Sequence, residues 1–208
     1  AAIALLESDS FKPNALVADV CGVKAAVEKA VYSMPRSYRY IGLHPMAGKE
    51  TSGLASSSEN LFAGANLVIT FAPQTEESAL IEAREYAALM GFGRITECSA
   101  EEHDKKIALT SQLAHLVSNA YVKSPSVSHC EGFTGGSFQD MTRIAGVDET
   151  MWAQLYMFNR KNILAELDCL LRHLESYRSA IAEDDESALS FELRQGRLIR
   201  ETIKRDKN

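Results

Sequence analysis

The sequence lacks the cysteine spacing that a zinc site or a disulfide-rich domain requires. No cysteine belongs to a Cys-x-x-Cys pair or has a histidine at metal-ligand spacing. The four cysteines are scattered along the chain at Cys21, Cys98, Cys130 and Cys169. Such scattered cysteines are typical of reduced thiols in the cytoplasm. We therefore expect neither a bound metal nor a disulfide framework, and we predict a cytoplasmic location.

Long apolar runs and blocks of like charge are also missing. No apolar stretch approaches the ~20 residues that span a bilayer. The opening Ala-Ala-Ile-Ala-Leu-Leu is too short for a signal peptide and is followed at once by Glu7 and Asp9. The 28 acidic and 22 basic residues are interspersed and give a net charge of −6. The sequence therefore argues against a membrane partner and against a nucleic-acid groove, although one or two arginines can still bind a small anion.

A glycine-rich phosphate loop is absent as well. Dinucleotide sites normally begin with a strand, Gly-x-Gly-x-x-Gly and a helix, because bare backbone lets the pyrophosphate approach. Gly91-Phe92-Gly93 fails this pattern, since Thr96 stands at the third glycine and a strand follows instead of a helix. The acidic or basic residue that selects NAD or NADP, expected about 20 residues past such a loop, is also missing.

The first part of the chain has the pattern of alternating strands and helices. The sequence predicts strands at residues 16–20, 40–43, 66–71 and 93–97. Thr75 is placed to cap the helix that follows the third strand. This β-α-β order predicts a mostly parallel sheet within a domain that covers residues 1–97.

The chain becomes helical after residue 98. Ser99 and Glu102 form a capping box for a helix predicted to end at Lys123. Asp148 is placed to cap a helix of about 30 residues, about 45 Å long, with apolar residues close to heptad spacing. That length exceeds what a domain of roughly 110 residues needs for its own core. The helix therefore packs either on a second copy or on the other helices of its own chain.

The run His44-Pro45-Met46-Ala47-Gly48-Lys49-Glu50-Thr51-Ser52-Gly53 is the strongest candidate for a functional loop. It follows a predicted strand, and catalytic groups in open α/β sheets gather at the carboxyl ends of strands. His44 can exchange a proton near neutral pH, and Pro45 stiffens the backbone after it. On these residues alone, a structural turn around a hydrogen-bonded histidine is an equally good interpretation.

Two further groups of polar residues share a helix face. At about 100° per residue, Asp104, Ser111 and His115 lie within roughly 20° of one helix face, which indicates a lined cleft, and His103 falls off this face. Asp140 stands three residues before Arg143, so the carboxylate can orient the guanidinium. A surface ion pair is the alternative for this second pair, while His129 and His173 receive no role.

Four ordered motifs resemble those of the prephenate dehydrogenase family. The run from His44 to Gly53 is similar to the family's His-Pro-Met-Ala-Gly-x-Glu-x-Ser-Gly loop. The other matching blocks are Asp19-Val20-Cys21-Gly22-Val23-Lys24, His103-Asp104 with Thr110-Ser111-Gln112-Leu113-Ala114-His115, and Gly135-Gly136-Ser137-Phe138-Gln139-Asp140-Met141-Thr142-Arg143. Trp152 and Asn159 also fall where the family has them, and the resemblance extends from about residue 15 to the end.

The resemblance implies a fold and an activity. The fold would be a partial Rossmann-like parallel sheet in residues 1–97, lacking its first strands, followed by an all-α substrate-binding and dimerisation domain in residues 98–208. The activity would be oxidative decarboxylation of prephenate to 4-hydroxyphenylpyruvate in tyrosine biosynthesis, with NAD or NADP as cofactor. The chain would form a homodimer through its C-terminal helices.

The resemblance also implies residue roles. His44 would accept the proton or hydrogen bond of the substrate's ring hydroxyl, and Arg143, oriented by Asp140, would bind the ring carboxylate. The remaining site residues would be His115 at the substrate's side chain, Glu50 and Ser52 in the loop, and Asp19 and Gly22 near the cofactor. Gly22 stands where the family commonly has serine, and Gln112 where many members have histidine.

Three alternatives remain open on the sequence. Arogenate could replace prephenate, because the two substrates differ only at the side chain. The missing phosphate loop favours a non-catalytic dimerisation and substrate-binding fragment, whereas the set of His44, Arg143 and His115 opposes it. Another hydroxy-acid dehydrogenase with a helical second domain is the third alternative, and the His44 loop argues against it.

Overall fold

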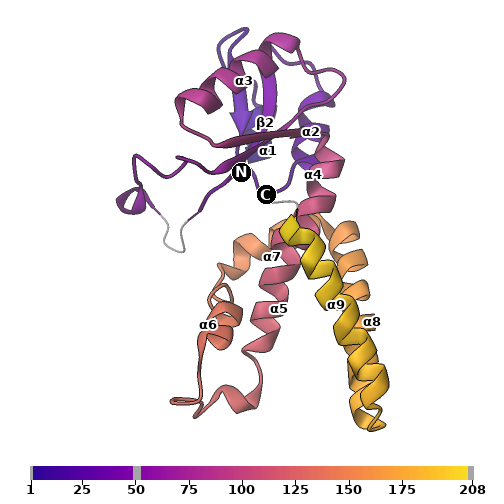
Figure 1. Ribbon diagram of the computed structural model, residues 1–208. Helices are drawn as coiled ribbons and strands as arrows, with labels where there is room; N and C mark the ends of the chain where they lie inside the picture. The colour runs from indigo at the N-terminus through magenta and orange to yellow at the C-terminus, as the bar shows by residue number, and fades with distance from the viewer. Residues whose placement is uncertain (1, 49–52, 206–208) are drawn as a thin grey trace. The chain divides into compact units, whose positions relative to one another are not determined.

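One four-stranded sheet, with strand order β1-β2-β3-β4, organises the first part of the molecule (Figure 1). The computed structural model describes residues 2–48 and 53–205. β1 (Leu16–Asp19) pairs in parallel with β2 (Arg39–Met46), β2 pairs antiparallel with β3 (Asn66–Thr70), and β3 pairs in parallel with β4 (Arg94–Cys98). The predicted mostly parallel sheet is therefore confirmed, and each predicted strand is found.

β2 extends beyond the strand predicted at 40–43. His44, Pro45 and Met46 continue the strand opposite Val68, Leu67 and Asn66 of β3. Proline is tolerated there although it donates no ladder hydrogen bond. The prediction that His44 follows the strand is wrong, because the antiparallel partner holds three more residues of the His44 run in the sheet.

Helices cover both faces of the sheet. On one face, α3 (Glu77–Leu89) packs Ala83 and Ala87 against Ile41, Leu43, Leu67 and Ile69. These alanines continue a stripe of small buried residues that starts at Ala79 and lets the helix approach the sheet closely. On the other face, Val27 and Val31 of α2 (Ala25–Tyr32) and Leu6 of α1 (Ala2–Glu7) pack on Tyr38 and Tyr40.

The predicted cap of α3 is wrong. Glu76 occupies the N-cap position without a side-chain cap. The hydroxyl of Thr75 instead accepts a hydrogen bond from the backbone N–H of Ala72 at 2.9 Å and lies 2.8 Å from the hydroxyl of Tyr32. Thr75 therefore closes the loop after β3 and links it to α2.

The helix predicted at 99–123 is interrupted. Ser99 caps α4 (Ala100–Ile107) by accepting from the Glu102 N–H at 3.1 Å, as predicted. A π-helical segment (Ala108–Leu113) then precedes α5 (Ala114–Tyr121). The 100° spacing that places Asp104, Ser111 and His115 on one face does not hold across this segment, and π-helical turns are frequent at functional sites.

The predicted helix of about 30 residues is two helices. Asp148 caps α7 (Glu149–Phe158) by accepting from the Met151 N–H at 2.7 Å, as predicted. Asn159 then leaves helical geometry with φ −106° and ψ 20° before α8 (Arg160–Ala182) begins. Two short 3-10 turns (Leu54–Ser56 and Pro125–Val127) and α6 (Gly136–Thr142) complete the elements that precede α7.

The molecule consists of two compact units, Ala1–Asn162 and Ile163–Asn208. The predicted boundary between residues 97 and 98 falls inside the first unit, at the end of β4. The second unit contains most of α8 and all of α9 (Glu186–Arg205), which run in opposite directions from the turn between them (Figure 1). In the part of the chain that the structure describes, no helix has both the length and the apolar character needed to cross a bilayer.

Candidate functional site

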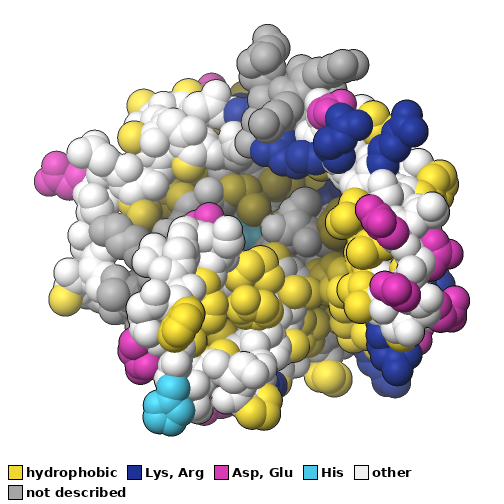
Figure 2. Space-filling model, turned by 60° about the horizontal axis from the view of Figure 1, so that its bottom comes forward, with side chains coloured by type: hydrophobic (Ala, Val, Ile, Leu, Met, Phe, Trp, Pro, Cys, Tyr) yellow, Lys and Arg dark blue, Asp and Glu magenta, His cyan; other side chains and the backbone are white. Residues whose placement is uncertain are grey.

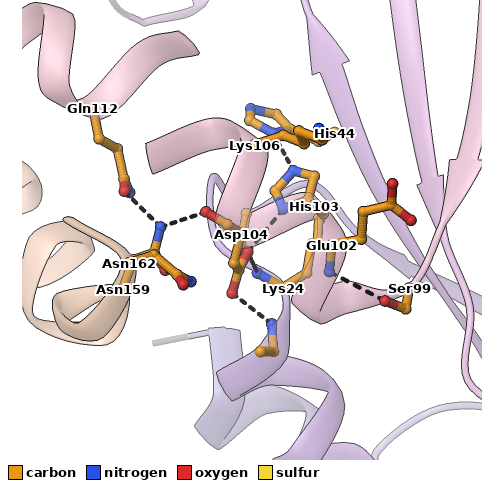
Figure 3. Close-up of polar contacts among 12 residues, drawn as sticks. Lys24, His44, Ser99, Glu102, His103, Asp104, Lys106, Gln112, Asn159 and Asn162 are labelled. Atoms are coloured by element: carbon orange, nitrogen blue, oxygen red, sulfur yellow. Dashed lines mark hydrogen bonds and ion pairs between the residues drawn. The ribbon is translucent and has the colours of Figure 1, made fainter. Parts of the chain in front are cut away.

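His44 lies beside a second histidine. His44 is on β2 and His103 is on α4. The Nδ1 of His44 lies 2.8 Å from the Nε2 of His103, and the two ring centroids are 5.0 Å apart (Figure 3). His44 is half-buried, whereas His103 is only 2% exposed. The sheet and the first helix of the following segment therefore meet through this histidine pair.

The sequence interpretation missed His103. Its Nδ1 lies 2.8 Å from Oδ1 of Asp104, so the three side chains form one chain of hydrogen bonds. A helical wheel compares residues on one helix only, and it places His103 away from Asp104 and His115. The available signal was the adjacent pair His103-Asp104 in the capped first turn of α4, in the same motif block as His115.

Asp104 is held by the N-terminus of α2. Its Oδ1 accepts from the backbone N–H of Lys24 at 2.8 Å, and its Oδ2 accepts from that of Ala25 at 2.9 Å (Figure 3). The first N–H groups of a helix lack partners within the helix, and the helix dipole favours a negative charge at this end. Asp104 is 3% exposed, so it supports the site from inside instead of lining a cleft.

Asn159 ties this arrangement to the break between α7 and α8. Its Nδ2 donates to the backbone carbonyl of Asp104 at 2.8 Å and to Oε1 of Gln112 at 2.7 Å. Gln112 is also buried, and its Nε2 has no hydrogen-bond partner among the atoms that the structure describes. The polar group at Asn159 therefore joins α4, the π-helical segment and the end of α7.

A buried ion pair fixes the carboxyl end of β1 beside His44. Asp19 accepts from Nζ of Lys24 at 2.8 Å, from the hydroxyl of Tyr40 at 2.5 Å and from the Cys21 N–H at 2.8 Å. Nζ of Lys24 also donates to the backbone carbonyl of Leu43. Burial lowers the pKa of Lys24, and the negative charge of Asp19 opposes this shift. Both oxygens of Asp19 are therefore bonded inside the protein, and the predicted roles of Asp19 and Gly22 at the cofactor stay predictions.

His44 is held in its neutral form. Burial, followed by the nearby His103 and Lys24, lowers the pKa of His44 from its usual value near 6.5 to about 4. At neutral pH the imidazole therefore has one nitrogen with a hydrogen and one with a lone pair. In residues 2–48 and 53–205, the Nδ1 of His44 makes a hydrogen bond and the Nε2 makes none.

We predict that an NMR titration of histidine-labelled protein gives a His44 midpoint near 4. The signal is assigned by its loss in His44→Asn. Because the folded-state pKa lies below the unfolded value, the stability contributed by neutral His44 is complete above about pH 6.5. That contribution is lost as the pH falls through about 4. A midpoint at or above 6.5 would contradict this environment for His44.

His115 lies against the molecule's single tryptophan. On α5, its Nδ1 lies 2.9 Å from the carbonyl oxygen of Ser111, and its ring centroid is 4.1 Å from that of Trp152 on α7. Tyr156 continues this aromatic row, with a centroid 5.6 Å from Trp152. An imidazole beside flat aromatic surface can hold a substrate that is partly apolar and partly polar.

Arg143 and Asp140 are exposed at the end of α6. The hydroxyl of Ser118 donates to the carbonyl of Met141 at 2.6 Å, and Nδ2 of Asn119 donates to that of Ala145 at 3.1 Å. These bonds fix the backbone around Arg143 against α5, the helix of His115. The predicted roles of Arg143, Asp140 and His115 stay predictions, and Glu50 and Ser52 lie outside the described residues.

Gly22 has room for a side chain. A Cβ added there meets only the Leu155 side chain, at 3.6 and 3.8 Å, and the φ of Gly22 is outside the left-handed region. A cavity of about 430 Å³ lies beside this turn, with mainly apolar lining residues that include Cys21, Val23 and Leu155. All four cysteines are free, and no cluster of possible metal ligands occurs within the described ranges.

Comparison with known proteins identifies the family. Residues 3–96 match the prephenate dehydrogenase nucleotide-binding domain, and residues 99–195 match the prephenate dehydrogenase dimerization domain. An α/β sheet domain followed by a helical domain is the arrangement that these two matches describe. The chain belongs to the prephenate dehydrogenase family, which confirms the family predicted from the four motifs.

Individual relatives agree with this assignment. The chain is 30% identical over 187 residues to the prephenate dehydrogenase of Bacillus subtilis (strain 168), an overlap of 86% of this chain and 50% of that protein. It therefore spans half the length of this relative. The crystal structure of Synechocystis arogenate dehydrogenase is similar, with TM-score 0.75 and 25% identity over 97% of this chain and 73% of that one. Prephenate dehydrogenase from A. aeolicus, in complex with hydroxyphenyl propionate and NAD+, gives TM-score 0.79 and 26% identity with the same coverage.

Proposed function

We propose that this chain binds prephenate and accepts the proton of its ring hydroxyl in an NAD- or NADP-dependent dehydrogenase. The product would be 4-hydroxyphenylpyruvate, in tyrosine biosynthesis. The observation that carries the proposal is the neutral His44, held by buried His103 while its Nε2 has no hydrogen bond among the described residues. A histidine with this environment can act as a base without first losing a proton.

The chemistry at His44 follows from the substrate. As the carbon–oxygen double bond forms, the hydroxyl proton passes to Nε2 of His44 and the hydrogen on that carbon leaves as hydride. Loss of carbon dioxide from the opposite ring carbon returns its bonding electrons to the ring, and the oxygen regains a proton as the ring becomes aromatic. The chain's tasks are to accept this proton and to hold the substrate in place.

Bound NAD or NADP would supply the hydride acceptor. The residues present fit part of such a cofactor, since the turn of Asp19 and Gly22 ends β1 beside the apolar cavity of about 430 Å³. The flat face of an aromatic cofactor ring can lie against apolar side chains of this kind.

The substrate's charged groups would be bound by the helical segment. Arg143 would bind the ring carboxylate through its planar guanidinium, with Asp140 as its orienting partner and Glu50 and Ser52 contributing from the loop. His115 and Trp152 would contact the side-chain end. The backbone bonds that fix α6 to α5 support this placement, because they hold the Arg143 backbone relative to the helix of His115.

A homodimer is part of the proposal, with residues 98–208 as the substrate-binding and dimerisation domain. The second unit leaves large apolar side chains exposed on both of its helices, and hydrophobic surface of this kind is yellow in Figure 2. On α9 they are Phe191, Leu193, Leu198, Ile199 and Ile203. Exposed apolar patches of this kind mark association surfaces. The match of residues 99–195 to the dimerization domain supports a second copy as the partner.

Arogenate is the second candidate substrate. A structurally similar protein from Synechocystis is an arogenate dehydrogenase. Arogenate has an amine at the side-chain position where prephenate has a ketone. A fragment that only binds substrate and dimerises is the other alternative, favoured by the absence of a glycine-rich loop from this sequence.

Fluorescence of Trp152 tests substrate binding directly. Because Trp152 is the single tryptophan and contacts His115, titration with prephenate or arogenate should give a saturable signal change. We predict that Arg143→Ala weakens this binding about 10- to 100-fold, the value of hydrogen bonds to a charged group. The control is Arg94→Ala on β4, which should bind as the wild type does. If neither ligand gives saturable binding, or Arg143→Ala binds normally, the proposed site is wrong.

Gly22→Ser should restore a hydroxyl that the family commonly has. The new Cβ would make only van der Waals contact with the Leu155 side chain, so the free energy of unfolding should change by no more than about 0.5 kcal/mol. We predict a two- to tenfold rise in kcat of the full-length protein, about one hydrogen bond's worth. Gly22→Ala adds the same Cβ without the hydroxyl and should leave kcat unchanged. A lower kcat in Gly22→Ser would show that the hydroxyl has no place there.

A further inference from the structure

We propose that His103 is a positioning residue that fixes the tautomer of His44, so that the Nε2 of His44 meets the substrate as a hydrogen-bond acceptor. The proposal rests on the function proposed above for His44. It assigns a role to a residue that belongs to one of the matching motif blocks but that received no role from the sequence. Three consecutive hydrogen bonds carry it, and they begin at the N-terminus of α2.

The first step is the state of Asp104. Backbone N–H groups can only donate, and those of Lys24 and Ala25 point at Oδ1 and Oδ2 of Asp104, respectively. Both oxygens are therefore acceptors, as in an ionised carboxylate. The N-terminus of α2 favours that negative charge. Asp104 thus presents an acceptor to anything that lies beside Oδ1.

The second step is the state of His103. Its Nδ1 lies 2.8 Å from Oδ1 of Asp104, so Nδ1 must carry the hydrogen of this bond. A neutral imidazole with hydrogen on Nδ1 has a lone pair on Nε2. With the ring buried between α4 and the sheet, His103 is held in one orientation.

The third step reaches His44. The lone pair on Nε2 of His103 faces Nδ1 of His44 at 2.8 Å, so Nδ1 of His44 is the donor (Figure 3). The remaining nitrogen of a neutral His44, Nε2, then carries a lone pair. The opposite arrangement would need a doubly protonated His103 that donates to His44, and it would make Nε2 of His44 a donor. The two arrangements place the proton on different nitrogens of His44.

The support for His103 is itself fixed. The amide of Asn159 donates to the carbonyl of Asp104, which holds the first turn of α4 to the break between α7 and α8. Asp104 also spans to α2, so three elements determine where His103 stands. Residues that orient a functional histidine in this way typically affect activity through its geometry and basicity.

Nitrogen chemical shifts of ¹⁵N-histidine-labelled protein test the tautomer without substrate. In the wild-type chain at neutral pH we expect hydrogen on Nδ1 of His44 and none on Nε2, with the signals assigned by their loss in His44→Asn. Hydrogen on Nε2 of His44 in the wild type would overturn the proposal. Because no substrate is present, this result is independent of whether the proposed function is right.

Two variants test the consequence in the full-length protein. His103→Gln can place a carbonyl oxygen near the position of Nε2 and still accept from His44, whereas His103→Asn reaches only the Nδ1 position. We expect His103→Asn to lower kcat about 10- to 100-fold with KM nearly unchanged, and His103→Gln to recover most of that loss. Wild-type kcat in His103→Asn, or equal losses in both folded variants, would overturn the positioning role. No turnover in the wild type would instead overturn the proposed function.

Discussion

Replacing His44 with asparagine should lower kcat of the full-length protein by about 10²- to 10⁴-fold, the usual contribution of a general base. The dissociation constant of prephenate should stay within about threefold of the wild-type value. Asparagine keeps an amide near the Nδ1 position, so the contact with His103 can persist while the Nε2 acceptor is lost. The substrate then binds among the same groups but has no acceptor for its hydroxyl proton.

Steady-state turnover and Trp152 fluorescence separate these two quantities. The matched control is His129→Asn, since His129 is exposed and its φ of 68° is one that asparagine adopts readily. The control should have wild-type kcat and binding. Unchanged turnover in His44→Asn would remove His44 from the chemistry. Equal losses of turnover and binding would assign it to substrate binding alone.

Replacing Lys24 with methionine should lower the free energy of unfolding by about 3–5 kcal/mol, the cost of leaving one member of a buried ion pair without its partner. Lys24 is 0% exposed and donates to Asp19 and to the carbonyl of Leu43. Methionine fills similar volume but donates nothing. Asp19 would keep its bonds to Tyr40 and the Cys21 N–H, but its buried charge would lose the ammonium.

Urea unfolding of the chain measures this effect. Lys29→Met is the control, because Lys29 lies on the same helix α2 but is exposed, and its free energy of unfolding should change by no more than about 0.5 kcal/mol. A loss below about 1 kcal/mol in Lys24→Met would show that the remaining hydrogen bonds satisfy Asp19 without the ion pair. The buried pair would then be unimportant for joining β1 to β2.

The strands of this fold could be predicted because their signal is local. The strand at 66–70 contains the apolar run Leu67-Val68-Ile69, and Leu67 and Ile69 are fully buried. The helix break at Asn159 could not be predicted in this way. It depends on bonds to Asp104 and Gln112, which lie 55 and 47 residues earlier in the chain. Apolar spacing continues through such a break, so it predicts one helix where tertiary contacts make two.

The candidate site shows the same division. His44 could be found from its motif, because the surrounding proline and glycines are sequence neighbours. His103 could not be found from the helical face, since its partner is 59 residues away, on a strand. The spacing along its helix places Asp104 on a polar face, but the backbone groups that bind Asp104 lie about 80 residues earlier. Residues that support a site from behind are determined by packing between elements, which spacing along one element does not contain.

The most direct test is turnover by the full-length protein, with prephenate and arogenate each paired with NAD and NADP, followed by the absorbance of the reduced nicotinamide. Cofactor reduction that depends on prephenate and is lost in His44→Asn is the predicted result, and the active pair would also identify the cofactor. Activity with arogenate alone would change the substrate and keep the chemistry at His44. No reduction with any of the four pairs, in a protein that is folded and dimeric, would contradict the proposed dehydrogenase and favour a binding or dimerisation role.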